Sequence, residues 1–357
     1  MRKTLKRIIC IIFMAVLLVM TGCSRNSDKV QEQTNETSQQ GHKYEYPQCG
    51  DYVYMVKDDG IRIREYKGNE EEINIPDKID GKPVISLGSG SFQYSGVRKV
   101  YIPDTVSEIA AYAFEGCDEL EEVSGCAGVE IIRYEAFDAC RNLKNIAIPQ
   151  NLKVIEEGCF MNCDNLESVV LPETLQSIGA AAFAMSDRLS HIEIPDSVTY
   201  IGLGAFRGTE WFDGLQGNVI VGDNVLIHHA TAAEGDGENV WIPQGVKMLS
   251  TDMVEDQVTK NLYIPDSVET IGGYYFSKMS GATVYIPSSI KYIDYSEEKR
   301  NADIFGLKKT FDISMVVEKR SVALRFARKY GIPCKVVDDV QAVYESTLAE
   351  HEAGQSE

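Results

Sequence analysis

Three of the nine cysteines, Cys117, Cys140 and Cys163, recur at an interval of 23 residues. Thiols in such a register could bind a metal ion, form a disulfide or pack as buried side chains. Zinc ligands normally come as close pairs separated by a turn, and this spacing contains no such pairs. The pattern favours buried free thiols, or bonds from side chain to backbone, over a disulfide or a metal site. Small hydroxyl residues fill the same position elsewhere: Ser95, Ser186 and Thr209.

The five histidines are scattered, and only His228 and His229 are adjacent. Neighbouring residues of a strand point to opposite faces, which argues against a shared metal ion. The sequence has no nucleophile-elbow, zinc-protease or phosphate-loop motif. We therefore expect no metal, no cofactor and no catalytic residue. An enzyme would need residues 209–238 to place Asp223 or these histidines beside other acids in a pocket.

Cys23 is the cysteine best placed for covalent chemistry. Four basic residues stand within residues 1–7, and residues 8–20 form an uninterrupted, mostly aliphatic run. That run is too short to span a membrane and is typical of a secretory signal. The segment Met20-Thr21-Gly22-Cys23 resembles a bacterial lipobox, which implies cleavage before Cys23 and lipid attachment to it. We expect a lipoprotein signal peptide at residues 1–22, the alternative being an ordinary secreted protein.

Residues 23–43 join the expected lipid site to the folded part of the chain. They are rich in Gln, Asn, Ser, Thr and Glu, with almost no aliphatic residues. Such a composition predicts disorder. A flexible chain extends by about 5–6 Å times the square root of its length, so the polar stretch of residues 24–48 would hold the folded part roughly 25–30 Å from a membrane.

The chain has 357 residues, is strongly acidic, with a net charge of −19, and is 44% hydrophobic. Nucleic-acid binding requires basic patches, so we expect no nucleic-acid partner. The same charge disfavours docking on anionic lipids. An acidic surface also keeps an extracellular protein soluble, and we expect a monomer.

A repeat of 23 residues organises the segment from Val100 to Phe206. Each unit begins at Ile-Pro or an equivalent pair, and Val or Leu follows three residues after the proline. An isoleucine comes three residues later, and a small residue then precedes a phenylalanine. A unit of this length cannot bury its own apolar face, so neighbouring units must stack. The phenylalanines are Phe114, Phe137, Phe160, Phe183 and Phe206.

The segment before each proline predicts one strand per unit. In Asn145-Ile146-Ala147-Ile148 the apolar residues alternate, and Pro149 ends the strand. The isoleucine and Ala-Phe positions predict a helical or 3₁₀ return. The expected fold is an α/β solenoid, a leucine-rich-repeat stack of 23-residue coils. It has a parallel sheet on one face, short helical or 3₁₀ returns, and a cap at each end.

The boundaries of these parts follow from breaks in the repeat. Alternation around Lys57-Asp-Asp-Gly60 predicts a hairpin in an N-terminal cap at residues 44–74. The solenoid is expected at residues 75–320, with an inserted hairpin module at 209–238 where the spacing of prolines lengthens. The amphipathic segment Ser321–Tyr330 predicts a C-terminal capping helix. The remaining expected divisions are a cap at 321–340 and an acidic tail at 341–357 that frays.

Aromatic residues occupy the outward position of several predicted strands, just before the Ile-Pro pair. These are Trp241, Tyr263 and Tyr285, with Tyr101 at the same position in an earlier coil. Strands lie about 4.8 Å apart, so the first three would stack on the solvent face of the sheet. Such rings suit peptide or sugar ligands. The alternative is that they only stabilise the sheet as cross-strand pairs.

The pattern Leu-x-x-Ile-x-Ile-Pro-x-x-Leu-x-x-Ile, followed by Phe-x-x-Cys, resembles the BspA-type leucine-rich repeats of bacterial surface proteins over roughly residues 44–335. The resemblance implies an extracellular binding, adhesion or antigen-like role and no known chemistry. We expect a non-catalytic adhesion lipoprotein on the outer face of the bacterial membrane, with protein or glycan partners. The alternatives are a structural or antigenic coat protein, or an accessory binding subunit of an extracellular hydrolase or transporter.

Overall fold

The computed structural model describes residues 46–228, 238–250, 259–272, 275–276, 279–294 and 311–354. All of them belong to one compact unit, Tyr46–Glu357. The predicted signal peptide, Cys23, the tether at 23–43 and His229 lie outside the described residues.

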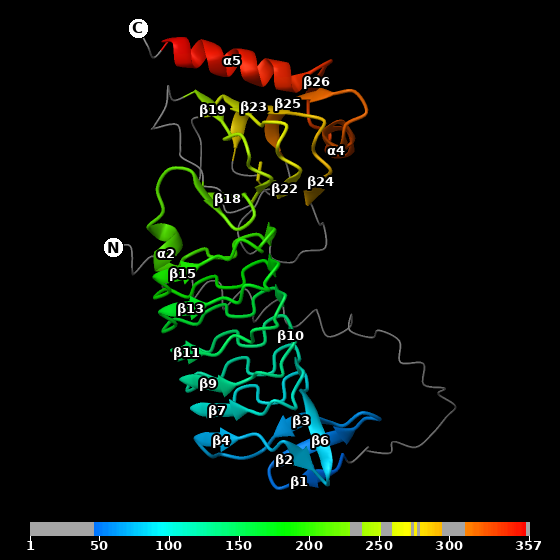
Figure 1. Ribbon diagram of the computed structural model, residues 1–357, viewed down its shortest axis with the longest axis vertical. Coiled ribbons are helices and arrows are strands. Elements are labelled where there is room, and N and C mark those ends of the chain that lie inside the picture. Colours follow the sequence, from blue (N-terminus) through cyan, green and yellow to red (C-terminus); the bar gives the residue numbers. More distant parts are fainter. Residues whose placement is uncertain are drawn as a thin grey trace, which may run out of the picture. The chain divides into compact units, whose positions relative to one another are not determined.

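Each 23-residue unit forms one coil of a β-solenoid (Figure 1). Strands at this position pair in parallel within two sheets, β4-β7-β9-β11 and β13-β15, so that Val100 in β7 (Lys99–Ile102) faces Val123 in β9 (Glu122–Gly125). In β7 the alternation buries Val100 and Ile102 and exposes Lys99 and Tyr101. The other strands of this first column are β4 (Glu72–Asn74), β11 (Asn145–Ile146), β13 (Ser168–Val170) and β15 (His191–Glu193).

The isoleucine of each unit lies in a strand of a second parallel sheet, and turns follow it where a helical or 3₁₀ return was expected. Two-residue strands pair from coil to coil, and the chain then turns through the Ala-Phe positions. The Phe114 N–H donates to the carbonyl of Ala136 in the next coil at 2.8 Å. Bonds between coils therefore satisfy backbone groups that a helix would satisfy internally. The strands are β8 (Glu108–Ile109), β10 (Ile131–Ile132), β12 (Val154–Ile155), β14 (Ser177–Ile178) and β16 (Tyr200–Ile201).

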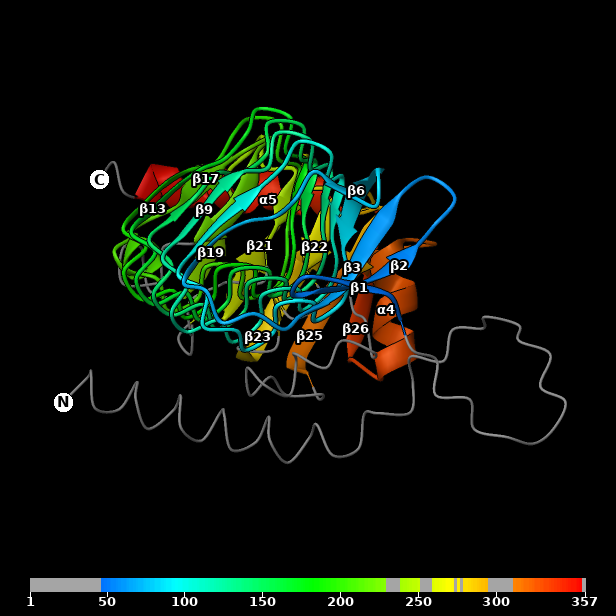
Figure 2. The same cartoon turned by 90° about the horizontal axis from the view of Figure 1, so that it is seen from below.

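The core of the coils contains a column of stacked phenylalanine rings. Neighbouring centroids lie 4.9–5.6 Å apart at interplanar angles of 4–16°. Figure 2 shows the stacked coils end-on. β9 and β13 lie on one side of the core and β6 on another. The column consists of Phe92, Phe114, Phe137, Phe160, Phe183 and Phe206.

The N-terminal end is closed by antiparallel strands. β2 (Tyr52–Val56) and β3 (Ile61–Tyr66) form the hairpin expected from their alternation. β1 (Gln48–Cys49) adds to β2, while β3 pairs in parallel with β6 (Lys82–Leu87) and so joins the second sheet. β5 (Lys78–Ile79) pairs with β6 in the antiparallel sense.

The repeat is interrupted after Phe206. Thr209 caps the short helix α2 (Glu210–Asp213), and Trp211 packs its ring against Phe206 with centroids 5.0 Å apart. β17 (Val219–Val221) and β18 (Val225–His228) then form the expected hairpin. β18 also pairs in parallel with β20 (Met248–Leu249), so this hairpin opens a separate sheet of five strands.

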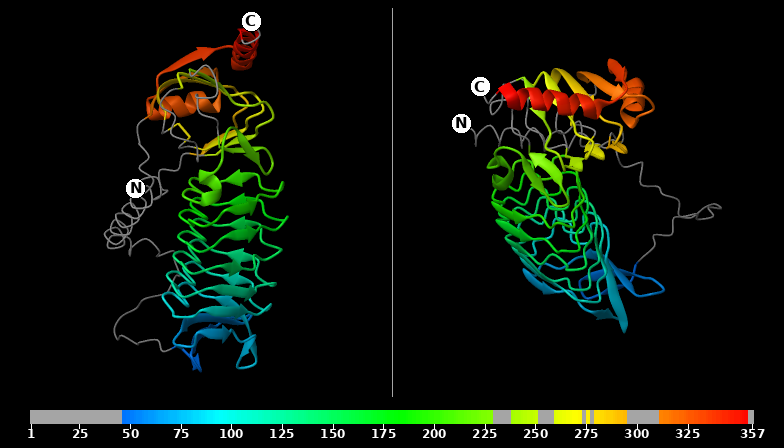
Figure 3. Two further views of the ribbon diagram at one scale, coloured as in Figure 1. Left: turned by 90° about the vertical axis from the view of Figure 1, so that its left-hand side faces the viewer. Right: turned by 45° about the horizontal axis from the view of Figure 1, so that its top comes forward.

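The C-terminal coils form two further sheets. One begins with β17, β18 and β20 and continues through β22 (Thr270–Gly272) to β24 (Tyr292–Asp294). The other sheet, here called the C-terminal outer sheet, has the order β19-β21-β23-β25-β26 and is visible in Figure 3. Its strands are β19 (Asn239–Trp241), β21 (Asn261–Tyr263), β23 (Ser280–Ile286), β25 (Asp312–Glu318) and β26 (Cys334–Val337).

Two helices complete the C-terminal end. The predicted capping helix is α4 (Val322–Tyr330), which begins at the N-cap Ser321 and ends at Gly331, whose φ of 67° suits glycine. The expectation of a fraying tail is wrong for most of its length, because α5 (Val340–Gly354) is helical. The Asp339 carboxylate accepts from the Ala342 N–H at 3.0 Å, which caps the first turn of α5.

Candidate binding surface

The three aromatic residues of the C-terminal outer sheet stack as their spacing predicts. Parallel pairing places Trp241 beside Tyr263, and Tyr263 beside Tyr285. The first pair has ring centroids 5.3 Å apart at 10°, and the second pair 4.4 Å apart at 21°. The alternation that turns these rings outward buries Val240, Leu262 and Val284. We call Trp241, Tyr263 and Tyr285 the aromatic ladder.

The aromatic ladder is not a free solvent face, because α5 lies on it (Figure 1). The Trp241 indole N–H donates to the Thr347 hydroxyl at 3.3 Å, and the His351 ring lies 4.5 Å from the Trp241 ring. Tyr263 is only 6% exposed. The sequence-based expectation of an open ladder is therefore corrected for Trp241 and Tyr263.

Three polar contacts fix the first half of α5 near the strand ends. The Tyr344 hydroxyl donates to the Ile242 carbonyl at 3.0 Å, and the Asp266 N–H donates to Gln341 Oε1 at 2.9 Å. The Val340 N–H donates to Glu318 Oε1 at 3.1 Å. These bonds satisfy backbone groups of both the sheet and the helix.

A ladder of neutral polar side chains runs beside the aromatic ladder, two residues earlier on each strand. Asn261 Nδ2 donates to Asn239 Oδ1 at 2.8 Å. The hydroxyls of Thr283 and Ser314 share a hydrogen bond of 3.0 Å. The outer face of this sheet thus carries aromatic rings along one line and amides and hydroxyls along the next. We call this second line the polar ladder.

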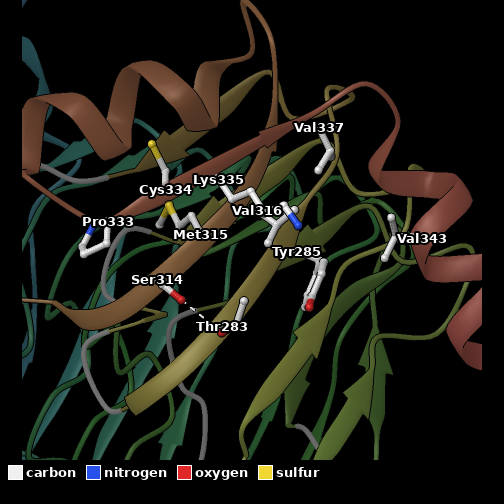
Figure 4. A pocket seen from close by; sticks show the side chains of 10 residues that line it. All are labelled: Thr283, Tyr285, Ser314, Met315, Val316, Pro333, Cys334, Lys335, Val337 and Val343. Carbon is white, nitrogen blue, oxygen red and sulfur yellow. Dashed lines mark hydrogen bonds between the residues drawn. The ribbon is translucent and has the colours of Figure 1, made fainter.

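An open groove of about 540 Å³ lies where the two ladders meet α5 (Figure 4). Tyr285 stands between Thr283 of its own strand and Val343 of α5. The register places Val316 of β25 on the side of Tyr285 opposite Tyr263. The other lining residues are Ser314, Met315, Pro333, Cys334, Lys335 and Val337.

Tyr101, the fourth aromatic candidate, does not join this surface. It is 44% exposed on β7, between Asn74 of β4 and Ser124 of β9. Among the described residues its ring stacks on no other aromatic ring. It therefore provides an outward tyrosine at the same repeat position but outside the aromatic ladder.

The cysteine column consists of buried free thiols, as the spacing favours. The thiols of Cys117, Cys140 and Cys163 donate to the carbonyls of Phe92, Phe114 and Phe137 at 3.0, 3.2 and 3.3 Å. Ser186 makes the same bond to the Phe160 carbonyl at 2.8 Å. Burial raises the pKa of the Cys117 thiol to about 11 and those of Cys140 and Cys163 well above the usual value.

Asp223 and His228, the two described residues of the set that an enzyme would require, have separate partners. Asp223 pairs with Lys247 at 2.5 Å, and the hydrogen bond from Lys247 lowers the pKa of that carboxyl. His228 Nδ1 lies 2.7 Å from the Gly217 carbonyl oxygen. Within the described ranges, no three His, Cys, Asp or Glu side chains gather where a metal ion could bind. No helix in this described part is long and apolar enough to cross a membrane.

Sequence reasoning missed the polar ladder and the contacts of α5. The spacing of Val340, Tyr344, Thr347 and His351 is that of one helical face, and this was the available signal. The acidic composition of the tail concealed it.

The model of the BspA type leucine rich repeat region matches residues 85–211 and 235–297 in six copies. These two ranges cover more than half of the 357 residues. The chain belongs to the BspA-type leucine-rich-repeat family.

Several solved structures are similar to this chain. A leucine rich cell surface protein of Faecalibacterium prausnitzii A2-165 is 23% identical over 73% of this chain and 96% of its own, with a TM-score of 0.49. A leucine rich repeat protein of T. pallidum is 28% identical over 44% and 81%, with a TM-score of 0.41. The pneumococcal vaccine antigen PcpA is 15% identical over 82% and 98%, with a TM-score of 0.41. No curated protein matches the chain.

Proposed function

We propose that this chain is a non-catalytic binding or adhesion protein of the bacterial cell surface. It contacts a protein or glycan partner through the C-terminal outer sheet. The observation that carries the proposal is the aromatic ladder, whose last ring, Tyr285, lines an open groove. Aromatic rings provide large contact area at small entropic cost, and neighbouring polar groups provide specificity.

We further propose that lipid on Cys23 holds the protein on the outer face of the membrane. The support is the basic and apolar sequence of residues 1–20 and the lipobox-like segment that follows. Replacing Cys23 by serine should release the protein into the medium or the soluble fraction. Full retention of the Cys23→Ser protein in the membrane fraction would contradict the anchor.

A structural or antigenic coat protein is the second candidate. It is favoured by the contacts of α5 with Trp241 and Tyr263, because an aromatic ladder can also stabilise packing alone. An accessory subunit that presents substrate to a hydrolase or transporter would use the same surface without turning substrate over.

A capture experiment separates these candidates. The protein serves as bait and is incubated with extracellular matrix, mucin and cell-wall glycans. Its captured partners are compared with those of the variant Trp241→Ser, Tyr263→Ser, Tyr285→Ser. The matched control replaces Tyr101 and Val170, exposed by 44% and 78% at the same outward position of other coils, with serine.

Capture by the parent and the control but not by a folded triple variant would support the proposed function. Capture that survives the triple substitution would contradict a binding role for the aromatic ladder. No capture by the parent would favour the coat protein.

A further inference from the structure

The groove and the covered part of the aromatic ladder form one surface divided by α5. Tyr285 lines the groove, whereas Tyr263 and Trp241 continue the same stack, and Trp241 contacts Thr347 and His351 in the second half of α5. The polar ladder runs beside the rings from Ser314 in the groove to Asn239 at the far edge of the sheet. A ligand that fills the groove would therefore meet the same two kinds of side chain, aromatic and neutral polar, if it extended beneath α5.

The chemistry of this surface fits a neutral glycan. Tyr285 offers an apolar ring flank beside the hydroxyls of Thr283 and Ser314, which suits the apolar faces and hydroxyl edges of sugar rings. The polar ladder adds amides that both donate and accept. Among the described residues that line the groove, Lys335 alone is charged, although the chain as a whole carries a net charge of −19.

The two halves of α5 are held unequally. Val340 and Tyr344, at its start, are fully or almost fully buried and make backbone contacts to the sheet. The second half touches the aromatic ladder through Thr347 and His351, which are only partly buried. A segment with few buried apolar contacts opens locally at small cost. The second half of α5 can therefore lift while Val340 and Tyr344 stay in place.

We propose that a neutral oligosaccharide binds in the groove and extends along the aromatic ladder by displacing the second half of α5. α5 thus acts as a lid over Trp241 and Tyr263. This inference rests on the proposed binding function and names its ligand class and its regulation. Because the extended ligand binds only the open form, its apparent affinity rises with the fraction of molecules in which the lid is open.

Weakening the helix without touching the sheet tests the lid. The variant Ala349→Gly, Glu350→Gly changes two exposed residues of α5, and glycine destabilises a helix interior. The control Glu350→Ala removes the same charge but keeps a good helix former. The probes are chitohexaose and maltohexaose, titrated against the full chain in detergent. We expect at least one hexaose to bind the glycine variant about tenfold more tightly than the parent or the control.

Hydrogen exchange supplies a readout that does not depend on affinity. In the parent, adding the bound hexaose should speed exchange of the amides of residues 346–354 and leave those of β7 to β16 unchanged. Slower exchange in residues 346–354 would show that α5 closes on the ligand, and would overturn the lid.

The remaining outcomes are also decisive. Equal affinity of the glycine variant and the parent, with α5 exchange shown to be faster in the variant, would overturn the lid. Failure of both hexaoses to bind either protein would overturn the glycan assignment. If a partner were still captured through the aromatic ladder, the proposed binding function would stand while this inference failed.

Discussion

The indole N–H of Trp241 donates to the hydroxyl of Thr347, 106 positions along the chain, at 3.3 Å. The Thr347 hydroxyl in turn lies 2.9 Å from the Val343 carbonyl oxygen of its own helix. This contact joins the first strand of the C-terminal outer sheet to the last helix. It explains why an aromatic ladder that faces outward from its sheet is nevertheless half covered.

Removing the Tyr344 hydroxyl should loosen α5. Tyr344 is 5% exposed, and its hydroxyl donates to the Ile242 carbonyl at 3.0 Å. We expect Tyr344→Phe to cost about 1 kcal/mol of helix docking, because the buried carbonyl loses its partner. Hydrogen exchange of the α5 amides measures this change. Tyr101→Phe removes an exposed hydroxyl and should leave α5 exchange unchanged; an equal effect of the two variants would refute the role of the Tyr344 bond.

The phenylalanine column should dominate the stability of the coils. Phe160 is fully buried between Phe137 and Phe183, with ring centroids 5.5 and 5.4 Å away. We expect Phe160→Ala to lower the free energy of unfolding by about 3–5 kcal/mol, since it removes apolar surface and leaves a cavity. Phe160→Leu should cost clearly less. Chemical denaturation measures both values, and equal losses would show that the apolar volume that leucine retains contributes little there.

Asp138 should make the protein less stable as pH rises from about 4 to about 7. Burial raises the pKa of its carboxyl to about 7, against about 4 in an unfolded chain. Between these values the folded state holds a proton that the unfolded state has lost, so stability falls with rising pH. Asn162 Nδ2 donates to Asp138 Oδ1 at 2.9 Å, a bond that asparagine can also accept.

Asp138→Asn should therefore flatten that part of the pH profile. At pH 8 we expect it to stabilise the protein by up to about 4 kcal/mol. The control Glu173→Gln changes an exposed carboxyl and should leave the profile as in the parent. Denaturation midpoints between pH 4 and 8 test this, and a profile unaltered by Asp138→Asn would exclude Asp138 as its source.

The thiols should divide into two classes of reactivity. Cys49 and Cys334 are exposed, whereas Cys117, Cys140 and Cys163 are buried and have raised pKa values. The thiolate is the reactive form, so iodoacetamide at pH 8 should label the two exposed cysteines rapidly and the column only after unfolding. Peptide mass spectrometry resolves each site. Rapid labelling of Cys140 in the folded protein would contradict the burial of the column.

The repeat identifies the core of the fold because each motif residue has one structural role. Ile102 and Phe114 are buried, as the period requires, and the aromatic ladder follows from strand alternation. The return segments, expected to be helical or 3₁₀, are turns, because alternate N–H groups such as that of Phe114 bond to the next coil. Bonds between coils depend on how coils stack, and a single repeat does not reveal them.

The position of α5 on the aromatic ladder could not be predicted for a similar reason. The inner face of α5 contains only Val340 and Tyr344 as well-buried residues, so its amphipathic pattern is weak. Its position depends on partners such as Ile242 and Trp241, about 100 residues earlier in the chain. Composition identified the tail as acidic but could not show this docking.

The most direct test of the proposed binding surface compares two tyrosines at one repeat position. Tyr285 belongs to the aromatic ladder and lines the groove, whereas Tyr101 stands alone on β7. Equilibrium binding of the captured partner, or of the hexaose that binds, should weaken at least about tenfold in Tyr285→Ser, a loss of roughly 1.4 kcal/mol. Tyr101→Ser should leave it unchanged. Equal affinity of both variants and the parent would contradict the proposed surface.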